Sequence, residues 1–130
     1  YEYLGITLDE QISSKLPELC IDRIKLKQAL LNLLRNAAEA VPVSGGKVKF
    51  CAFSSEKAVH ISITDNGCGI PNEQLKQIFM PFITFKKNGT GLGLAITAQI
   101  ILAHGGNIYA ENEPAPGVSF HILLPETFRG

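Results

Sequence analysis

Hydrophobic positions alternate with polar ones along several short segments of the chain, and they follow a helical period along longer ones. Alternation is typical of a half-buried β-strand, and a period near 3.6 is typical of an amphipathic helix. Alternation predicts strands at 47–53, 59–64, 107–112 and 118–124, and a first extended segment at 1–14. The helical period predicts helices at 23–41, 71–78 and 95–104. This order predicts an α+β fold, a two-layer sandwich with a mixed sheet of about five strands and its helices on one face.

The helix predicted at 23–41 carries an apolar arc and, beside it, a polar strip. Asp22 stands before it as a candidate N-cap. The polar strip contains Gln28, Asn32, Asn36 and Glu39. Asn32 and Asn36 are four residues apart, so their side chains are neighbours on the helix. Since asparagine is a mediocre helix former, the pair fits either solvent exposure and helix-end chemistry, or two amides that face a ligand or a metal ion.

A carboxylate stands where the strand predicted at 59–64 ends. Asp65 opens the glycine-rich segment Asp65-Asn66-Gly67-Cys68-Gly69-Ile70. An aspartate there can accept a hydrogen bond from an amino group such as that of adenine, and the glycines let the backbone approach a flat ligand. Asn-Gly is also a strong hairpin signal. Because Pro71 and a helical pattern follow instead of a returning strand, we favour a ligand-binding loop.

A second glycine-rich segment, Gly89-Thr90-Gly91-Leu92-Gly93-Leu94, runs into the apolar helix predicted at 95–104. A glycine loop that enters a helix presents free N–H groups and the positive end of the helix dipole, which suits a phosphate group. Leu94 occupies the position at which the dinucleotide-binding fingerprint needs glycine, and the P-loop pattern is absent. The segment alone therefore leaves phosphate binding open.

Composition narrows the classes of protein and of partner. With 130 residues and 45% hydrophobic content, the chain is long enough for one domain with its own core, and we expect 1–130 to be a single domain. Its twelve basic and twelve acidic residues argue against a nucleic-acid surface. No apolar run reaches membrane-spanning length. Three cysteines without a Cys-x-x-Cys pair fit a reducing, cytoplasmic setting. The strand-like start at Tyr1 indicates a piece of a longer protein.

Four motifs, in order and spacing, resemble the ATP-binding catalytic domain of sensor histidine kinases, which is related to the gyrase, Hsp90 and MutL ATPases. They are the N box Gln28–Ala37, the first glycine box Asp65–Ile70, the F box Phe79–Phe82 and the second glycine box Gly89–Leu94, followed by His104-Gly105-Gly106 and Leu124-Pro125. The resemblance covers nearly the whole chain and implies the Bergerat (GHKL ATPase) fold. Many members have lysine at the position of Glu39. The segment Asn36-Ala37-Ala38-Glu39-Ala40 instead resembles the subclass of nitrogen-regulation and sporulation kinases.

The resemblance also implies ATP and Mg²⁺ as cofactors and assigns roles to residues. Asp65 would accept the adenine amino group, with Gly67 and Gly69 letting the loop approach the base. Asn36 would ligate Mg²⁺ through its amide oxygen, since Mg²⁺ usually has few protein ligands. The lid over the phosphates would contain Gly89, Gly91 and Gly93. The other expected nucleotide contacts are Arg35, Ile70, Phe82, Lys86, Thr90, Leu92 and Leu94.

Asn32 bears on the type of reaction. Clamp-type ATPase relatives have a glutamate there that activates water, but an amide has no useful basicity near neutral pH. Hydrolysis should therefore be slow, with the γ-phosphoryl group kept for another acceptor. The resemblance implies an ATP:protein-histidine phosphotransferase with Asn32 and Asn36 as catalytic residues. The resemblance also implies that the phosphoacceptor is a histidine on a separate dimerisation domain. His60, His104 and His121 are expected to have structural or surface roles.

The same resemblance implies a cytoplasmic domain in a homodimeric kinase that acts on a response regulator, with no nucleic-acid or membrane contact by this domain. It leaves open whether the full-length kinase is anchored in a membrane. We hypothesise that Arg35 supplies the positive charge at the phosphates that the missing lysine would otherwise supply. Two other functions stay open: a conformational ATPase of the Hsp90 or MutL sort, and an anti-sigma-like nucleotide-binding or serine kinase module.

Overall fold

A computed structural model of the chain describes residues 2–3, 6–12, 22–40, 45–55, 58–75, 77–79, 93–113 and 117–125. Within them, six strands form one sheet in the order β1-β2-β3-β4-β6-β5. The strands are β1 Glu2–Tyr3, β2 Ile6–Ile12, β3 Gly46–Ser55, β4 Ala58–Asp65, β5 Asn107–Asn112 and β6 Val118–Pro125. β2 and β3 pair in parallel, whereas all other neighbours are antiparallel. The predicted mixed sheet is therefore confirmed, with six strands instead of about five.

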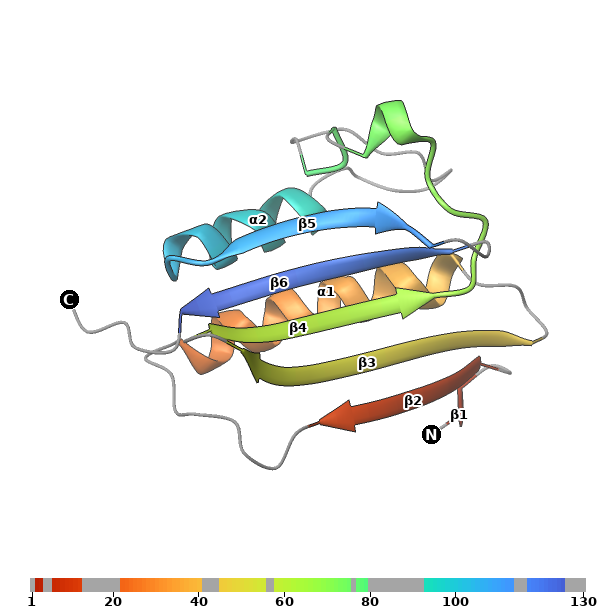
Figure 1. Cartoon of the computed structure of the whole chain (residues 1–130), viewed down its shortest axis with the longest axis horizontal. Coiled ribbons are helices and arrows are strands. Elements are labelled where there is room, and N and C mark those ends of the chain that lie inside the picture. Colours follow the sequence, from red (N-terminus) through yellow and green to blue (C-terminus); the bar gives the residue numbers. More distant parts are fainter. Residues whose placement is uncertain are drawn as a thin grey trace.

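Two α-helices, α1 (Arg23–Ala40) and α2 (Gly93–Ala103), lie on the same face of the sheet (Figure 1). The predicted two-layer α+β architecture is thus confirmed. No helix in the described part of the chain is long and apolar enough to cross a membrane. The prediction of a helix at 71–78 is wrong in type, because the structure has a single 3-10 helix, η1 (Asn72–Gln74), followed by turns. Pro71 precedes η1 in an extended conformation and gives it no side-chain cap.

The single extended element predicted at 1–14 is also wrong. Glu2 pairs with Thr7 and Tyr3 with Ile6 in antiparallel register, so β1 and β2 are two strands. Gly5 lies between them in the sequence, and a short glycine-containing connection between two apolar runs is a hairpin signal.

The core lies between the sheet and the two helices. Burial alternates along β4, which puts Val59, Ile61 and Ile63 in the core. The other fully or nearly fully buried apolar side chains near them include Ala29, Leu33, Ala37, Ile101, Phe120, Ile122 and Leu124. Burying each large side chain of this kind contributes about 1.5–3 kcal/mol. The apolar arc predicted on the long helix is therefore the face that fixes α1 against the sheet.

The ends of the two helices are joined by one histidine. Asp22 Oδ1 accepts hydrogen bonds from the N–H groups of Ile24 (3.0 Å) and Lys25 (3.1 Å), which confirms the predicted N-cap. α2 ends at Ala103, and Gly105 two residues later has φ +75°. His104 Nδ1 lies 2.7 Å from the Ile100 carbonyl oxygen, and Nε2 accepts the Asp22 N–H at 2.9 Å. His104 thus has the structural role expected from the sequence.

Replacing Asp22 by alanine should lower the free energy of unfolding by about 1 kcal/mol, because two N–H groups of the first turn of α1 lose their acceptor. Urea unfolding followed by circular dichroism measures this change. Asp22→Asn keeps an oxygen acceptor and should retain most of the stability. Equal losses in the two variants would contradict the capping role.

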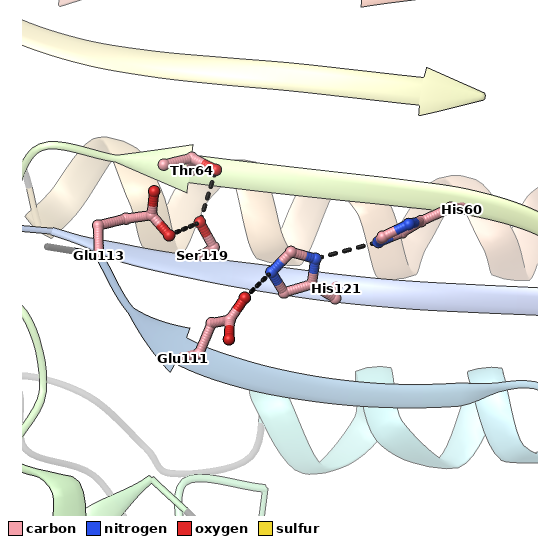
Figure 2. A network of polar contacts seen from close by, with 6 residues as sticks. All are labelled: His60, Thr64, Glu111, Glu113, Ser119 and His121. Atoms are coloured by element: carbon pink, nitrogen blue, oxygen red, sulfur yellow. Dashed lines mark hydrogen bonds and ion pairs between the residues drawn. The ribbon is translucent and has the colours of Figure 1, made fainter.

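Ring side chains gather on the face of the sheet opposite α1 and α2. His60 Nε2 on β4 lies 3.0 Å from His121 Nδ1 on β6, and His121 Nε2 lies 2.9 Å from Glu111 Oε1 on β5 (Figure 2). Tyr109 stacks on the His121 ring with centroids 4.8 Å apart, and Phe53 packs against His60 at the same separation. Burial, with a smaller contribution from the nearby His121 ring, lowers the pKa of His60 below its usual value of 6.5.

This lowered pKa makes part of the stability depend on pH. The unfolded chain binds a proton at His60 near pH 6.5, whereas the folded chain binds it only at lower pH. The contribution is therefore fully present above pH 6.5 and is lost as the pH falls from there through the folded pKa. We expect His60→Gln to weaken the dependence of the urea midpoint on pH between about 7.5 and 5.5. An unchanged pH dependence would show that His60 does not supply it.

Candidate functional site

Three elements that carry described parts of the motifs are directed toward the same end of the sheet. Asp65 ends β4, Gly93 begins α2, and the C-terminal half of α1 extends toward the same end (Figure 1). β5 ends and β6 begins at this end as well. A carboxylate, a helix N-terminus and the amide strip of α1 thus lie on three elements that surround one end of the fold.

Asp65 is a buried carboxylate, with 4% of its surface exposed. Its Oδ1 accepts the Gly67 N–H at 2.8 Å. Burial raises its pKa above the usual 3.8, and hydrogen bonds from the backbone N–H groups of Gly67 and Val118 oppose this rise. The charged form is therefore held by backbone donors in a place poor in water. A further N–H donor from a ligand would stabilise that charge more than it would in open solvent.

The first glycine box is tied to the start of β3 by Asn66. Its Oδ1 accepts the Lys47 N–H at 2.8 Å, and its Nδ2 donates to the Gly45 carbonyl at 3.0 Å. Gly69 adopts φ +81°, a conformation that favours glycine. No strand returns from this loop, since η1 follows Pro71. The hairpin interpretation of Asn66-Gly67 is thus excluded.

The polar strip of α1 meets the first turn of α2. Asn32 Nδ2 lies 3.5 Å from the Gly93 carbonyl oxygen and 3.4 Å from Thr97 Oγ1, which are long and weak hydrogen bonds. Thr97 is fully buried, and its hydroxyl donates to the same Gly93 carbonyl at 2.9 Å. Asn36 is half-buried on the next turn of α1, and Arg35 beside it is exposed. The N box is therefore next to the end of the second glycine box.

Comparison with known proteins decides the family. Residues 21–127 match the family of Histidine kinase-, DNA gyrase B-, and HSP90-like ATPases. Sporulation kinase A of Bacillus subtilis is 42% identical over 105 residues, which are 81% of this chain and 17% of that protein. The Escherichia coli signal transduction histidine-protein kinase AtoS is 43% identical over 116 residues, 88% of this chain and 19% of that protein. The chain thus spans about a fifth of the length of these relatives.

Solved structures agree. The catalytic domain of histidine kinase ThkA superposes with a TM-score of 0.86 at 38% identity, covering 95% of this chain and 81% of that one. This chain belongs to the histidine kinase catalytic domains. ThkA in complex with the response regulator TrrA gives a TM-score of 0.81 at 34% identity (95% and 35% covered). Full-length ShkA in complex with AMPPNP gives 0.82 at 32% identity (94% and 26% covered).

Several positions expected to bind nucleotide in this histidine kinase domain lie outside the described residues. They are Phe82, Lys86, Gly89, Thr90, Gly91 and Leu92. Ile70 and Leu94 are described, and both are half-buried and packed against the core. They fix the ends of the two glycine boxes to the fold. Contact of these eight residues with a nucleotide stays a prediction.

The described residues of the histidine kinase domain fit ATP and Mg²⁺ by their chemistry. A buried carboxylate suits the amino group of a base, and a helix that begins in a glycine-rich segment suits phosphates. The amide oxygen of Asn36 is the kind of ligand that Mg²⁺ accepts alongside phosphate oxygens and waters. Sequence reasoning missed three supporting residues: Asn66 and Thr97, described above, and Asn112 at the end of β5. Their polar side chains gave no pattern in the sequence that pointed to these contacts.

Proposed function

We propose that this chain binds ATP with Mg²⁺ and donates the γ-phosphoryl group to a histidine on a separate dimerisation domain. The chain would act as one catalytic domain, residues 1–130, of a longer histidine kinase. The observation that carries the proposal is the buried Asp65 carboxylate at the end of β4, where it opens the first glycine box and accepts the Gly67 N–H.

Asp65 would accept the adenine amino group, and the backbone between Gly67 and Gly69 would lie against the base. The complex of ShkA, a similar structure, with AMPPNP supports nucleotide binding by this chain. Asn36 would hold Mg²⁺, which on binding neutralises charge on the phosphates. Arg35 is exposed one residue before Asn36, which leaves its side chain accessible to a phosphate oxygen.

The chemistry of the described residues favours phosphoryl transfer over hydrolysis. Asn32 occupies the position of the water-activating residue of the clamp ATPases, and its amide lies toward Gly93 and Thr97. An amide cannot take a proton from water at neutral pH. The contribution of this domain is then to bind and orient the nucleotide, while the acceptor is an imidazole outside it.

The other parts of the proposal concern partners and location. The complex of ThkA with TrrA supports a response regulator as the downstream partner. We infer a homodimeric full-length kinase, because the acceptor would lie on a dimerisation domain. Cys68 is an exposed free thiol, which fits the reducing cytoplasm, where ATP and Mg²⁺ are available.

The test is incubation of the chain with ATP, Mg²⁺ and the purified dimerisation domain of the same kinase. We expect phosphate on that domain that is labile in acid and stable in base, as phosphohistidine is. Phosphate release without transfer would support a conformational ATPase, and nucleotide binding with neither would support a binding module. An acid-stable phosphoester would indicate a serine kinase.

Two variants control this experiment. Asn36→Ala should abolish transfer by removing the proposed Mg²⁺ ligand. Asn107→Ala, at the exposed start of β5, should transfer at the wild-type rate. Normal transfer by Asn36→Ala would contradict the magnesium assignment.

A further inference from the structure

We propose that Asn112, at the end of β5, is a positioning residue that holds the first glycine box in the shape required for nucleotide binding. This inference rests on the proposed function, because it concerns the same nucleotide site. Asn112 is far from the first glycine box in the sequence, and no motif includes it.

Asn112 uses its whole carboxamide group on the end of this loop. Its Oδ1 accepts the Ile70 N–H at 2.9 Å, and its Nδ2 donates to the Ile70 carbonyl oxygen. Nδ2 also donates to Asn72 Oδ1 at 3.1 Å. Both backbone groups of Ile70 are therefore satisfied by one side chain, as a neighbouring strand would satisfy them. This contact fixes where the loop ends, while Asn66 fixes where it begins.

Gly69 is fitted to the same side chain. A Cβ atom on Gly69 would lie 3.0 Å from Asn112 Oδ1, and the φ of +81° already disfavours other residues. The loop therefore passes in close contact with Asn112 just before Ile70. A shift of the Asn112 amide would move the backbone that is proposed to lie against the base.

The segment that carries Asn112 is itself held by a chain of hydrogen bonds. The Glu113 N–H donates to the Gly117 carbonyl at 3.1 Å. The Ser119 hydroxyl donates to Glu113 Oε2 at 2.8 Å, and Thr64 Oγ1 lies 2.7 Å from Ser119 Oγ (Figure 2). Because the single Ser119 proton points to Glu113, Thr64 donates to Ser119. The residue after Asn112, Glu113, is thus connected through Ser119 to Thr64 on β4, one residue before Asp65.

The test compares nucleotide affinities of folded variants. Asn112→Asp keeps the size and the acceptor for the Ile70 N–H but cannot donate to the Ile70 carbonyl or to Asn72. We expect ADP and ATP to bind about tenfold more weakly, equivalent to about 1.4 kcal/mol, with the same factor for both because the defect lies on the adenine side. Asn107→Asp makes the same change at the other end of β5 and should bind as the wild type.

Affinity is measured by calorimetry at a temperature where circular dichroism shows each variant folded, so that a loss of stability alone does not change the result. Asn112→Leu, which removes all three hydrogen bonds, should also speed hydrogen exchange at the Ile70 amide in the absence of nucleotide. If Asn112→Leu does not fold, Asn112→Asp decides the question alone.

Unchanged affinities in the folded Asn112 variants, beside a wild type that binds, would overturn the positioning role and leave the proposed function intact. So would a loss for ATP that is absent for ADP. A wild type that binds neither nucleotide would instead overturn the proposed function, and this inference with it.

Discussion

Replacing Asp65 by alanine should weaken binding of ATP and ADP by about 100-fold, because the adenine amino group loses its charged acceptor and such a bond contributes up to about 3 kcal/mol. The loss should be the same for both nucleotides, since the phosphates are not involved. Isothermal titration calorimetry measures it. An affinity close to that of the wild type would count directly against the adenine assignment.

Asp65→Asn distinguishes the effect of the buried charge on stability from its effect on nucleotide affinity. The pKa of Asp65 is raised above 3.8 in the folded chain, so the folded state holds this proton to higher pH than the unfolded state does. The stability from this proton is present below pH 3.8 and is lost as the pH rises through the folded pKa. The wild type should therefore lose stability relative to Asp65→Asn as the pH rises from about 4 to 7, while Asp65→Asn binds nucleotide poorly. A constant difference in stability would contradict the raised pKa.

Gly117→Ala should lower the free energy of unfolding by at least about 3 kcal/mol, among the largest effects of a single substitution. A Cβ atom at this position would lie 2.0 Å from the Asp65 carbonyl oxygen, and φ is +142°. Because the added Cβ atom would collide with a backbone oxygen, no rotation of a side chain can relieve the contact. Thermal unfolding and urea titration measure the loss.

Gly45→Ala is the matched control for this substitution. Its φ is also positive, +82°, but no atom of the described residues would lie within 4 Å of a Cβ atom there. We expect a loss of about 1–2 kcal/mol from the backbone conformation alone. Equal losses in the two variants would show that the collision with Asp65 contributes nothing.

The sequence predicted the elements that form by local periodicity. Alternation located β3 to β6, and the helical period located α1 and α2, because one face of each is buried in the core. The prediction of a short helix at 71–78 was wrong, since Pro71 and Glu73 resemble a helix start but no side-chain cap completes it. The parallel pairing of β2 with β3 has no local signal at all.

At the candidate site, too, residues in sequence motifs could be predicted, whereas residues that act through tertiary contacts could not. Asp65 and the two glycine boxes could be predicted as ligand-binding segments, because their spacing follows a known set of motifs. Asn112 was not found, because its partner Ile70 is 42 residues away and an asparagine at a strand end is ordinary. Asn66 was predicted only as a member of the first glycine box, although its side chain also bonds to Gly45, just before β3, and to Lys47 on β3. Contacts that depend on tertiary structure leave no pattern in one sequence.

Because burial alternates along β4, the number of residues in that strand determines on which face of the sheet His60 and Asp65 lie. Odd-numbered residues from Val59 to Asp65 are buried, whereas His60 and its even-numbered neighbours are not fully so. Deleting one residue between His60 and Asp65 would carry one of these two side chains to the wrong face. Either the Asp65 carboxylate would turn to the opposite face of the sheet, or the His60 imidazole would enter the apolar core. Insertions and deletions inside β4 should therefore be tolerated only in pairs.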